Sequence, residues 1–301
     1  MNYKLLSLLA VFASASTVLA ATPTGVPEGY VVTPFGYYHA SCVQRLAEGD
    51  ILKPDELVIQ HPDGNLDSVH ACTYAHYTDT GEAVAADAKE PKIKHAWIED
   101  VFAKTSTSYG ALYTEWKVPP APKSHDGQTV YFFPGFEDDK DVVTILQPVL
   151  GWNSAFVDTW NIASWNCCVK GTVFESTPIV VNPGDTILGA VYDNCKAGTL
   201  ECNSWTVITK DVTSGKQTNL NHTSNFKQTF NWAFVNVLEV YSVVRCSDLP
   251  PNDALTARSI ELFNDKFDQL NSPSWFLSVA SVTPKCGYGA HGNETTQTIT
   301  Y

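Results

Sequence analysis

Two polar side chains stand in otherwise apolar runs of the sequence and could act together on an amide bond. Glu239 lies between Leu238 and Val240, and Gln147 follows Leu146. A carboxyl group held among apolar neighbours has a raised pKa, which suits a general acid or base that works below neutral pH. A neutral amide beside it can donate a hydrogen bond to the oxyanion that forms when water attacks a peptide carbonyl. The pair therefore predicts amide hydrolysis without a metal ion or a covalent intermediate.

Each of these two residues also has a purely structural interpretation. A single glutamate in a strand often faces solvent, and Gln147, which precedes Pro148, can simply cap the end of a strand. A pair of residue types is only a hypothesis until their side chains are placed. The geometry of the folded chain therefore decides between the two interpretations.

Sequence motifs of several other enzyme classes are missing. The chain contains no Gly-x-Ser-x-Gly nucleophile motif, no His-Glu-x-x-His zinc motif and no Gly-x-x-x-x-Gly-Lys phosphate loop. Its eight histidines never recur four residues apart, as two metal ligands on one helix face would. We therefore predict that the protein uses no metal ion and no cofactor.

The N-terminus predicts export from the cell. Lys4 precedes a mostly apolar run over residues 5–13, and Val18-Leu19-Ala20 has the small-residue pattern of a cleavage site. We therefore assign residues 1–20 as a secretory signal peptide. No later run reaches the ~20 apolar residues that a transmembrane helix needs, so we predict a secreted protein without a membrane span.

Eight cysteines follow the predicted cleavage site, and an even number in an exported chain predicts four disulfide bonds. Their spacing favours two local pairs, Cys42 with Cys72 and Cys195 with Cys202. The remaining four are then expected to pair among themselves, in an order that spacing leaves open. These four are Cys167, Cys168, Cys246 and Cys286.

The surface of the mature protein is predicted to be acidic and glycosylated. The sequence has 19 Lys and Arg residues against 32 Asp and Glu residues, which gives a formal net charge of −13. Proteins that bind nucleic acid need clustered basic side chains, so this balance excludes a nucleic-acid partner. Asn221 and Asn293 begin Asn-x-Thr sequons, which mark surface loops for glycosylation in an exported chain.

Short strands are the elements that must position Glu239 and Gln147. Along the middle of the chain, β-branched and aromatic runs alternate with turn signals such as Pro183-Gly184. Runs of this length and spacing are typical of an all-β sandwich or barrel. They cover residues 112–118, 129–133, 141–146, 156–162, 172–181, 186–192, 205–211, 229–236 and 238–245.

The mature chain divides into two parts. Residues 21–95 form an appended N-terminal segment with few clear strands, and residues 96–301 form the β-sandwich domain. No stretch of flexible linker composition separates the two parts. Helical patterns are confined to short stretches such as residues 51–57 and 253–267. We therefore expect a protein with very little helix.

Three motifs carry a resemblance to a known family. They are ALYTEWKVP at residues 111–119, TILQ at residues 144–147 and LEVY at residues 238–241. In order and spacing they resemble the glutamic peptidases of fungi, the eqolisins. The resemblance implies a concanavalin-like or jelly-roll-like β-sandwich of two packed antiparallel sheets that acts as an acid endopeptidase on peptide substrates. It also implies that Gln147 and Glu239 take the positions of the family's catalytic glutamine and glutamate. The candidate groove-lining residues are Tyr113, Trp116 and Trp152.

The resemblance covers about residues 110–245 and leaves the N-terminal segment without a counterpart. Residues 21–95 are acidic on balance, whereas the activation propeptide of the family is typically basic. We therefore expect this segment to be retained in the mature protein.

Two functions of other classes are compatible with the same sequence. The sandwich can bind or process carbohydrate if its aromatic residues stack on sugar rings. Alternatively, an apolar pocket around the Gln147 and Glu239 positions can bind a small hydrophobic metabolite and steer a cyclisation or cycloaddition. A peptidase needs an open groove, a sugar binder needs exposed aromatic faces, and a cyclase needs a closed apolar pocket. The aromatic residues available for stacking are Trp116, Trp152, Trp160, Trp165 and Tyr241.

Overall fold

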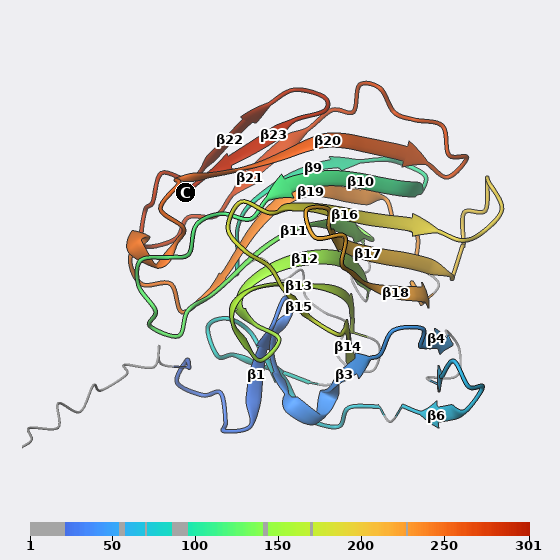
Figure 1. The fold of residues 1–301 in the computed structure, drawn as a ribbon, viewed down its shortest axis with the longest axis horizontal. Helices are drawn as coiled ribbons and strands as arrows, with labels where there is room; N and C mark the ends of the chain where they lie inside the picture. The colour runs from blue at the N-terminus through green and yellow to red at the C-terminus, as the bar shows by residue number, and fades with distance from the viewer. Residues whose placement is uncertain are drawn as a thin grey trace, which may run out of the picture.

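A computed structural model describes residues 22–53, 58–69, 71–85, 96–140, 144–168, 171–226 and 228–301. The predicted signal peptide lies outside these ranges. Within them nearly all regular structure is β-strand, arranged in one sheet of nine strands, one of ten and a small one of four (Figure 1). The two large sheets pack face to face, so the predicted all-β sandwich is confirmed.

The nine-stranded sheet carries both Gln147 and Glu239. Its order is β21-β9-β19-β11-β12-β13-β14-β3, and β15 pairs with β13. Neighbouring strands are antiparallel, except that β3 lies parallel to β14. The strands are β3 (Val43–Leu46), β9 (Trp97–Lys104), β11 (Thr129–Glu137), β12 (Ile145–Ser154), β13 (Val157–Cys167), β14 (Val173–Ser176), β15 (Ile179–Val180), β19 (Trp232–Tyr241) and β21 (Phe276–Val279).

The ten-stranded sheet has the order β22-β23-β20-β10-β16-β17-β18-β4-β5-β6. The two predicted helical stretches lie here as strands, as far as they are described, so that expectation is wrong. The strands are β4 (Ile51–Lys53), β5 (Val58–Gln60), β6 (Leu66–Ser68), β10 (Tyr109–Lys117), β16 (Thr186–Asp193), β17 (Trp205–Asp211), β18 (Gln217–Thr223), β20 (Ala254–Asn264), β22 (Gly289–Gly292) and β23 (Gln297–Thr300).

Strand alternation divides the side chains of the nine-stranded sheet between two hydrophobic cores. Leu146, Leu150 and Leu238 point between the two large sheets and are fully buried there. Val149 and Val237 point the opposite way, into a second core on the outer face of the sheet. By the same alternation both candidate catalytic side chains point to this outer face.

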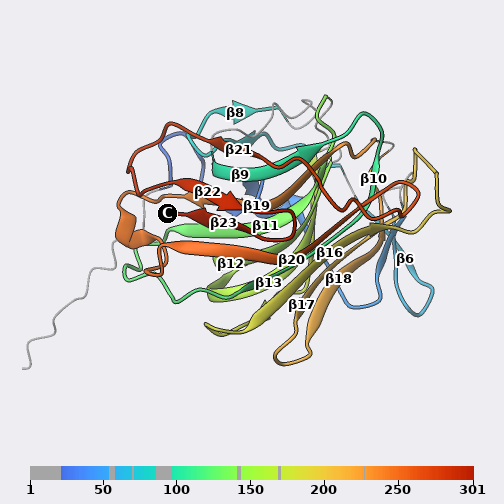
Figure 2. The same cartoon turned by 90° about the horizontal axis from the view of Figure 1, so that it is seen from above.

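The N-terminal part of the chain covers that outer face. We name its described residues between 22 and 85 the covering segment. Phe35, Tyr37 and Tyr38 of this segment are almost completely buried in the outer core. Figure 2 shows β8 on the opposite side of the nine-stranded sheet from β17 and β18. The segment thus contains more strands than the sequence suggested: besides β3 to β6 it holds β1 (Tyr30–Thr33), β2 (Gly36–His39), β7 (His76–Tyr77) and β8 (Ala83–Val84).

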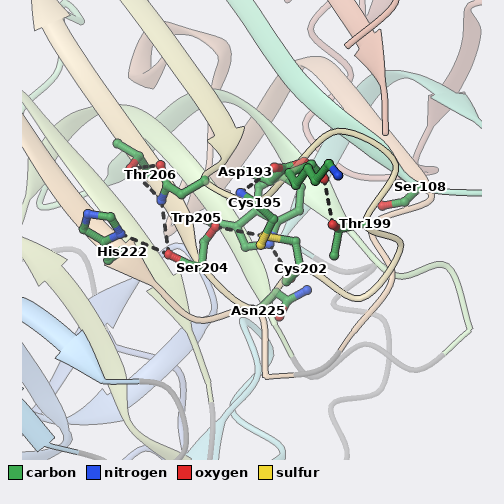
Figure 3. The surroundings of a disulfide bond; sticks show 12 residues. Ser108, Asp193, Cys195, Thr199, Cys202, Ser204, Trp205, Thr206, His222 and Asn225 are labelled. Carbon is green, nitrogen blue, oxygen red and sulfur yellow. Dashed lines mark hydrogen bonds between the residues drawn. A yellow bond between two sulfur atoms is a disulfide. The ribbon is translucent and has the colours of Figure 1, made fainter. Parts of the chain in front are cut away.

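All eight cysteines are paired. Cys42 bonds Cys72 within the covering segment, and Cys195 bonds Cys202 in the loop between β16 and β17 (Figure 3). Both local pairs predicted from spacing are therefore confirmed. The remaining pairs are Cys167 with Cys168 and Cys246 with Cys286.

The two sequons lie in different environments. Asn293 is exposed between β22 and β23, as expected for a surface loop. Asn221 instead lies within β18, is half-buried, and pairs with Ile51 of β4. Glycosylation at both positions stays a prediction, and Asn293 has the more open surroundings.

We predict that replacing Cys42 and Cys72 together by Ser lowers the free energy of unfolding by about 3.5 kcal/mol. The bond closes a loop with a sequence separation of 30, and closing a loop of that length removes chain entropy from the unfolded state. Urea denaturation of the variant and the wild type measures the difference. The matched control replaces Cys195 and Cys202, whose separation is 7, and a loss of about 2 kcal/mol is expected there. Equal losses would contradict the loop-length argument.

Candidate active site

Glu239 is fully buried on β19 with one carboxylate oxygen unsatisfied. The Tyr241 hydroxyl donates a hydrogen bond of 2.5 Å to Oε1, while Oε2 accepts none from the described residues. Burial raises the pKa of Glu239 well above its ordinary value, and the Tyr241 hydroxyl only partly offsets this. The charge of Asp79 raises the same pKa further, and the indole of Trp97 lowers it. Glu239 is therefore held as a neutral acid at acid pH.

Tyr131 is the cross-strand neighbour of Glu239 and lies fully buried beside it. Its hydroxyl donates a hydrogen bond of 3.4 Å to the backbone carbonyl of Val32, in β1 of the covering segment. The neighbour of Tyr131 on its other side is Gly151. A Cβ atom at position 151 would lie 3.2 Å from Cδ1 of the Tyr131 ring and 2.6 Å from Cβ of Ser154. The absence of a side chain there gives the tyrosine ring its space.

Gln147 lies on the same face as Glu239. It belongs to a different row of the sheet, where a row is a set of residues that pair with one another across neighbouring strands. It is fully buried, and neither its Oε1 nor its Nε2 has a hydrogen-bond partner among the described residues. Tyr131 pairs with Glu239 and with Gly151, and Gln147 precedes Gly151 by four residues. Strand geometry therefore separates the Cα atoms of Gln147 and Glu239 by about 13 Å along the strands and about 10 Å across them. The structure brings the two side chains to one face and does not bring them into contact.

A second buried carboxyl, Glu175 on β14, shares the row of Gln147. Trp165 of β13 pairs with Gln147 on one side and with Glu175 on the other. Arg45 of the covering segment donates two hydrogen bonds to Oε1 of Glu175, from Nε at 2.9 Å and from Nη2 at 2.6 Å. Burial raises the pKa of Glu175, and the guanidinium of Arg45 opposes that rise. This carboxyl is therefore held by the covering segment itself.

Unsatisfied polar atoms gather on this outer face. Buried polar groups in folded proteins nearly always have hydrogen-bond partners, so an accumulation of exceptions points to a binding or catalytic site. A cavity of about 190 Å³ lies between the face and the covering segment, where Val32 and Thr33 meet Trp165 and Glu175. The unsatisfied atoms include Nε1 of Trp97, Oε1 and Nε2 of Gln147, Nε1 of Trp165, Oε2 of Glu175 and Oε2 of Glu239.

The other predicted site residues lie elsewhere. Trp116 and Trp152 are buried between the two large sheets. Tyr113 is on the outer side of the ten-stranded sheet, where its ring stacks on that of Tyr192 at 6.3 Å. None of these three side chains lies on the face that carries Glu239, so their role in lining a groove stays a prediction.

The aromatic residues considered for sugar stacking are all inside the protein. Trp160, Trp165 and Tyr241 are buried, as are Trp116 and Trp152. These five residues therefore form no exposed aromatic platform.

The described residues include one group with the spacing of metal ligands. Asp193, Cys195 and Cys202 place their ligand atoms within 4.8 Å of one another. Figure 3 shows that the two sulfur atoms are joined in a disulfide, and Asp193 Oδ1 accepts a 2.9 Å hydrogen bond from the Cys195 amide. This group offers a metal one carboxylate and no thiolate.

In the same described ranges, no helix has the length and apolar character to cross a membrane.

No family model matches the chain, and no curated protein is similar to it in sequence. Among solved structures, it resembles scytalido-glutamic peptidase with a peptide-based transition-state analogue, at 12% identity over 69% of this chain and 98% of that chain, with a TM-score of 0.49. It also resembles SCP-B, a member of the eqolisin family in a complex with the tripeptide Ala-Ile-His, at 13% identity, the same coverage and a TM-score of 0.48. For aspergilloglutamic peptidase from Aspergillus niger the identity is 14%, the coverage 57% and 98%, and the TM-score 0.41. The resemblance predicted from the motifs is thus found again, and at these values it assigns neither an activity nor a site residue.

Sequence reasoning missed Tyr131 and Glu175. Glu175 follows the apolar pair Val173-Phe174, which is the same signal that singled out Glu239. Tyr131 stands in an aromatic run with Phe132 and gives no such signal, because only the register of three strands places it beside Glu239.

We predict that Glu239→Gln changes how stability depends on pH. The folded protein keeps a proton on Glu239 above pH 4.5, the ordinary pKa, whereas the unfolded chain releases it. The contribution of this residue to the free energy of unfolding is therefore complete below pH 4.5 and is lost as pH rises toward the raised pKa. The neutral amide of the variant cannot lose a proton, so the stability of the variant relative to wild type should increase with pH.

Urea denaturation of both proteins at a series of pH values measures this difference. Other buried carboxyls contribute equally to the two proteins and cancel. A difference that is the same at every pH would show that Glu239 has an ordinary pKa in the folded protein.

Proposed function

We propose that this protein is a secreted, acid-acting endopeptidase-like enzyme that hydrolyses peptide bonds on the outer face of the nine-stranded sheet. Glu239 acts as general base and then general acid, and Gln147 donates a hydrogen bond to the oxyanion. Export is proposed from the predicted signal peptide together with the four disulfides.

One observation carries the proposal. An extended stretch of the chain already lies on this face, and it presents the peptide carbonyl of Val32 to the Tyr131 hydroxyl. Tyr131 is the direct cross-strand neighbour of Glu239. The face thus accommodates an extended peptide and holds one of its carbonyl groups next to the row that contains the buried acid. A substrate bound in the same way would have a peptide bond within that row.

The proposed reaction uses one water molecule and no cofactor. Burial keeps most of Glu239 protonated at acid pH, so the reaction starts from the ionised fraction of this residue. Ionised Glu239 takes a proton from water while the water oxygen bonds to the carbonyl carbon. The carbonyl oxygen becomes an oxyanion, and the Gln147 amide stabilises it by donating a hydrogen bond. Glu239 then gives its proton to the amide nitrogen, the carbon–nitrogen bond breaks, and a carboxylic acid and an amine leave. Gln147 lies four residues from Gly151, which is in the row of Glu239 and Tyr131. The Tyr131 hydroxyl is therefore a second candidate for the oxyanion donor.

The two alternative functions have less support. Carbohydrate stacking needs exposed aromatic faces, and the five aromatic residues considered for it are buried. A cyclisation site for a hydrophobic metabolite needs an apolar pocket, whereas the cavity on this face is lined in part by Thr33, Thr129 and Glu175. The lining is mixed, because Val31 and Phe156 also belong to it. Its polar groups favour a ligand that also forms hydrogen bonds, such as a peptide.

We predict that the full chain cleaves a denatured protein substrate in the acid part of the range from about pH 2 to 7. Glu239→Gln should abolish the activity, because the amide cannot accept a proton from water. Gln147→Ala should lower kcat by about 100- to 1000-fold if Gln147 is the oxyanion donor. Because the covering segment occupies the face, activity is measured with and without prior incubation in acid.

Two further variants decide between the donors and control for folding. Tyr131→Phe removes only the hydroxyl, so a loss of kcat in this variant but not in Gln147→Ala would assign the donor to Tyr131. Ile260→Val changes a buried residue of the other core and should leave kcat near the wild-type value. The absence of cleavage by folded wild-type protein at every pH would overturn the proposed function.

A further inference from the structure

The edge of β14 receives part of the covering segment as an added strand. Val43–Leu46, as β3, pairs in parallel with Val173–Ser176, and Arg45 stands directly opposite Glu175. Strand addition of this kind is a common mode of peptide recognition, in which main-chain hydrogen bonds hold the peptide and pockets read alternate side chains. The residue that β14 reads in this way is an arginine.

The guanidinium of Arg45 is held by three different groups. Oε1 of Glu175 accepts from Nε and Nη2, and the backbone carbonyl of Ala155 accepts from Nη2 at 3.2 Å. The ring of Phe156 lies 5.7 Å from the Cζ atom of Arg45, within the range of a cation–π contact. A planar, forked cation with several donors satisfies all three groups at once, whereas a lysine ammonium lacks the fork. The set forms a guanidinium pocket.

The pocket is built into the sandwich domain and not into the covering segment. Glu175 belongs to β14, and Ala155 and Phe156 form the turn between β12 and β13, where both have positive φ angles, 53° and 65°. The side chain of Glu175 is almost completely buried, at 1% exposure. Its second oxygen, Oε2, has no hydrogen-bond partner among the described residues, and Glu175 also lines the neighbouring cavity. Arg45 itself is 40% exposed at the side chain, so the arginine enters the pocket from solvent.

We infer that the pocket formed by Glu175, Ala155 and Phe156 is a recognition site for an arginine side chain of a peptide that adds as a strand to β14, and that Arg45 occupies it in this structure. The inference rests on the proposed function in one respect, because it names arginine-containing peptides as the class of substrate that the face selects in the less acid part of the working range, where Glu175 is ionised. A formal net charge of −13 also favours the approach of cationic peptides.

An ion pair that only fastens the covering segment would show the same two hydrogen bonds. The two roles differ in what happens when Arg45 is removed. A fastening pair leaves behind a damaged contact, whereas a recognition pocket remains and accepts an arginine that is not part of the chain. Restoring the interaction with a free arginine derivative therefore separates the roles.

The experiment uses the full chain with Arg45→Ala and measures its Tm while a small probe is added at neutral pH. The probe is Nα-acetyl-arginine amide, and the matched control is Nα-acetyl-citrulline amide, which has the same shape without the charge. We expect a saturable rise in Tm with the arginine probe, because a ligand that binds only the folded state stabilises it. The citrulline control should bind at least about tenfold more weakly than the arginine probe. Wild type, whose pocket is filled, should show no such rise.

The double variant Arg45→Ala with Glu175→Gln tests whether the carboxylate of Glu175 binds the guanidinium of the probe. The Tm of this variant should not rise with the arginine probe. The response of Arg45→Ala should also fade as pH falls, because the pKa of Glu175 is raised by burial and a protonated carboxyl no longer attracts a cation. Arg45→Gln, which keeps most of the side-chain stem, serves as a second background with the same expected response. Equal Tm shifts with the arginine and citrulline probes, or a shift that persists in the double variant, would overturn the inference.

Failure of the proposed function is distinguishable from failure of this inference. If wild type cleaves no peptide but Arg45→Ala responds to arginine and not to citrulline, the pocket stands and the peptidase proposal fails. If peptides are cleaved at equal rates with arginine or citrulline and no Tm response occurs, the peptidase proposal stands and the pocket is wrong.

Discussion

The exclusion of water from the outer face of the nine-stranded sheet governs the rest of this structure. A sheet face that carries a glutamine and two glutamates would ordinarily be solvated, because burying such groups without partners costs free energy. Here the covering segment removes the water and replaces only some of the lost hydrogen bonds. It provides Arg45 to Glu175 and the Val32 carbonyl to Tyr131. The atoms that it leaves unsatisfied are those at which the proposed substrate would bind.

The same exclusion of water affects carboxyl groups throughout the sandwich. Burial raises the pKa of Glu99 to about 8, and those of Asp100 and Asp193 to about 6. Carboxyls of this kind stabilise the fold most below the pKa of the unfolded chain, and their contribution is lost as pH rises through these values. These three carboxyls therefore favour the folded protein more at acid pH than at neutral pH.

The fold class and the local disulfides could be predicted from the sequence because both depend on neighbouring residues. The stretch at residues 253–267 lies mostly in β20, whose side-chain alternation is interrupted. Positive φ at Ser259 marks a bulge in β20, and it shifts the side-chain alternation by one residue. The buried positions then fall at Leu255, Ala257, Ile260 and Leu262, so the stretch lacks the continuous two-residue alternation that identifies a strand in sequence.

The site itself could be predicted only in part. Glu239 and Glu175 give a local signal, a carboxyl in an apolar run, although only the first was singled out. The four-residue offset between Gln147 and Glu239, and the place of Tyr131 between β19 and β12, depend on strand register. Register depends on the pairing of whole strands and on bulges as well as on local alternation, so the residues next to Glu239 and Gln147 do not fix it by themselves.

The closure of the Cys42–Cys72 bond within the covering segment has a consequence for how long that segment stays in place. The other three disulfides join residues between 167 and 286, so the backbone is the only covalent link between the segment and the sandwich. A single cut between residues 85 and 96 would turn an intramolecular contact into a bimolecular one. While the chain is intact, the covering segment is present at the face at an effective concentration in the millimolar range. After the cut, the fraction of molecules with a covered face would depend on the much lower concentration of the released segment in solution. The sandwich would keep all of its own disulfides through that change.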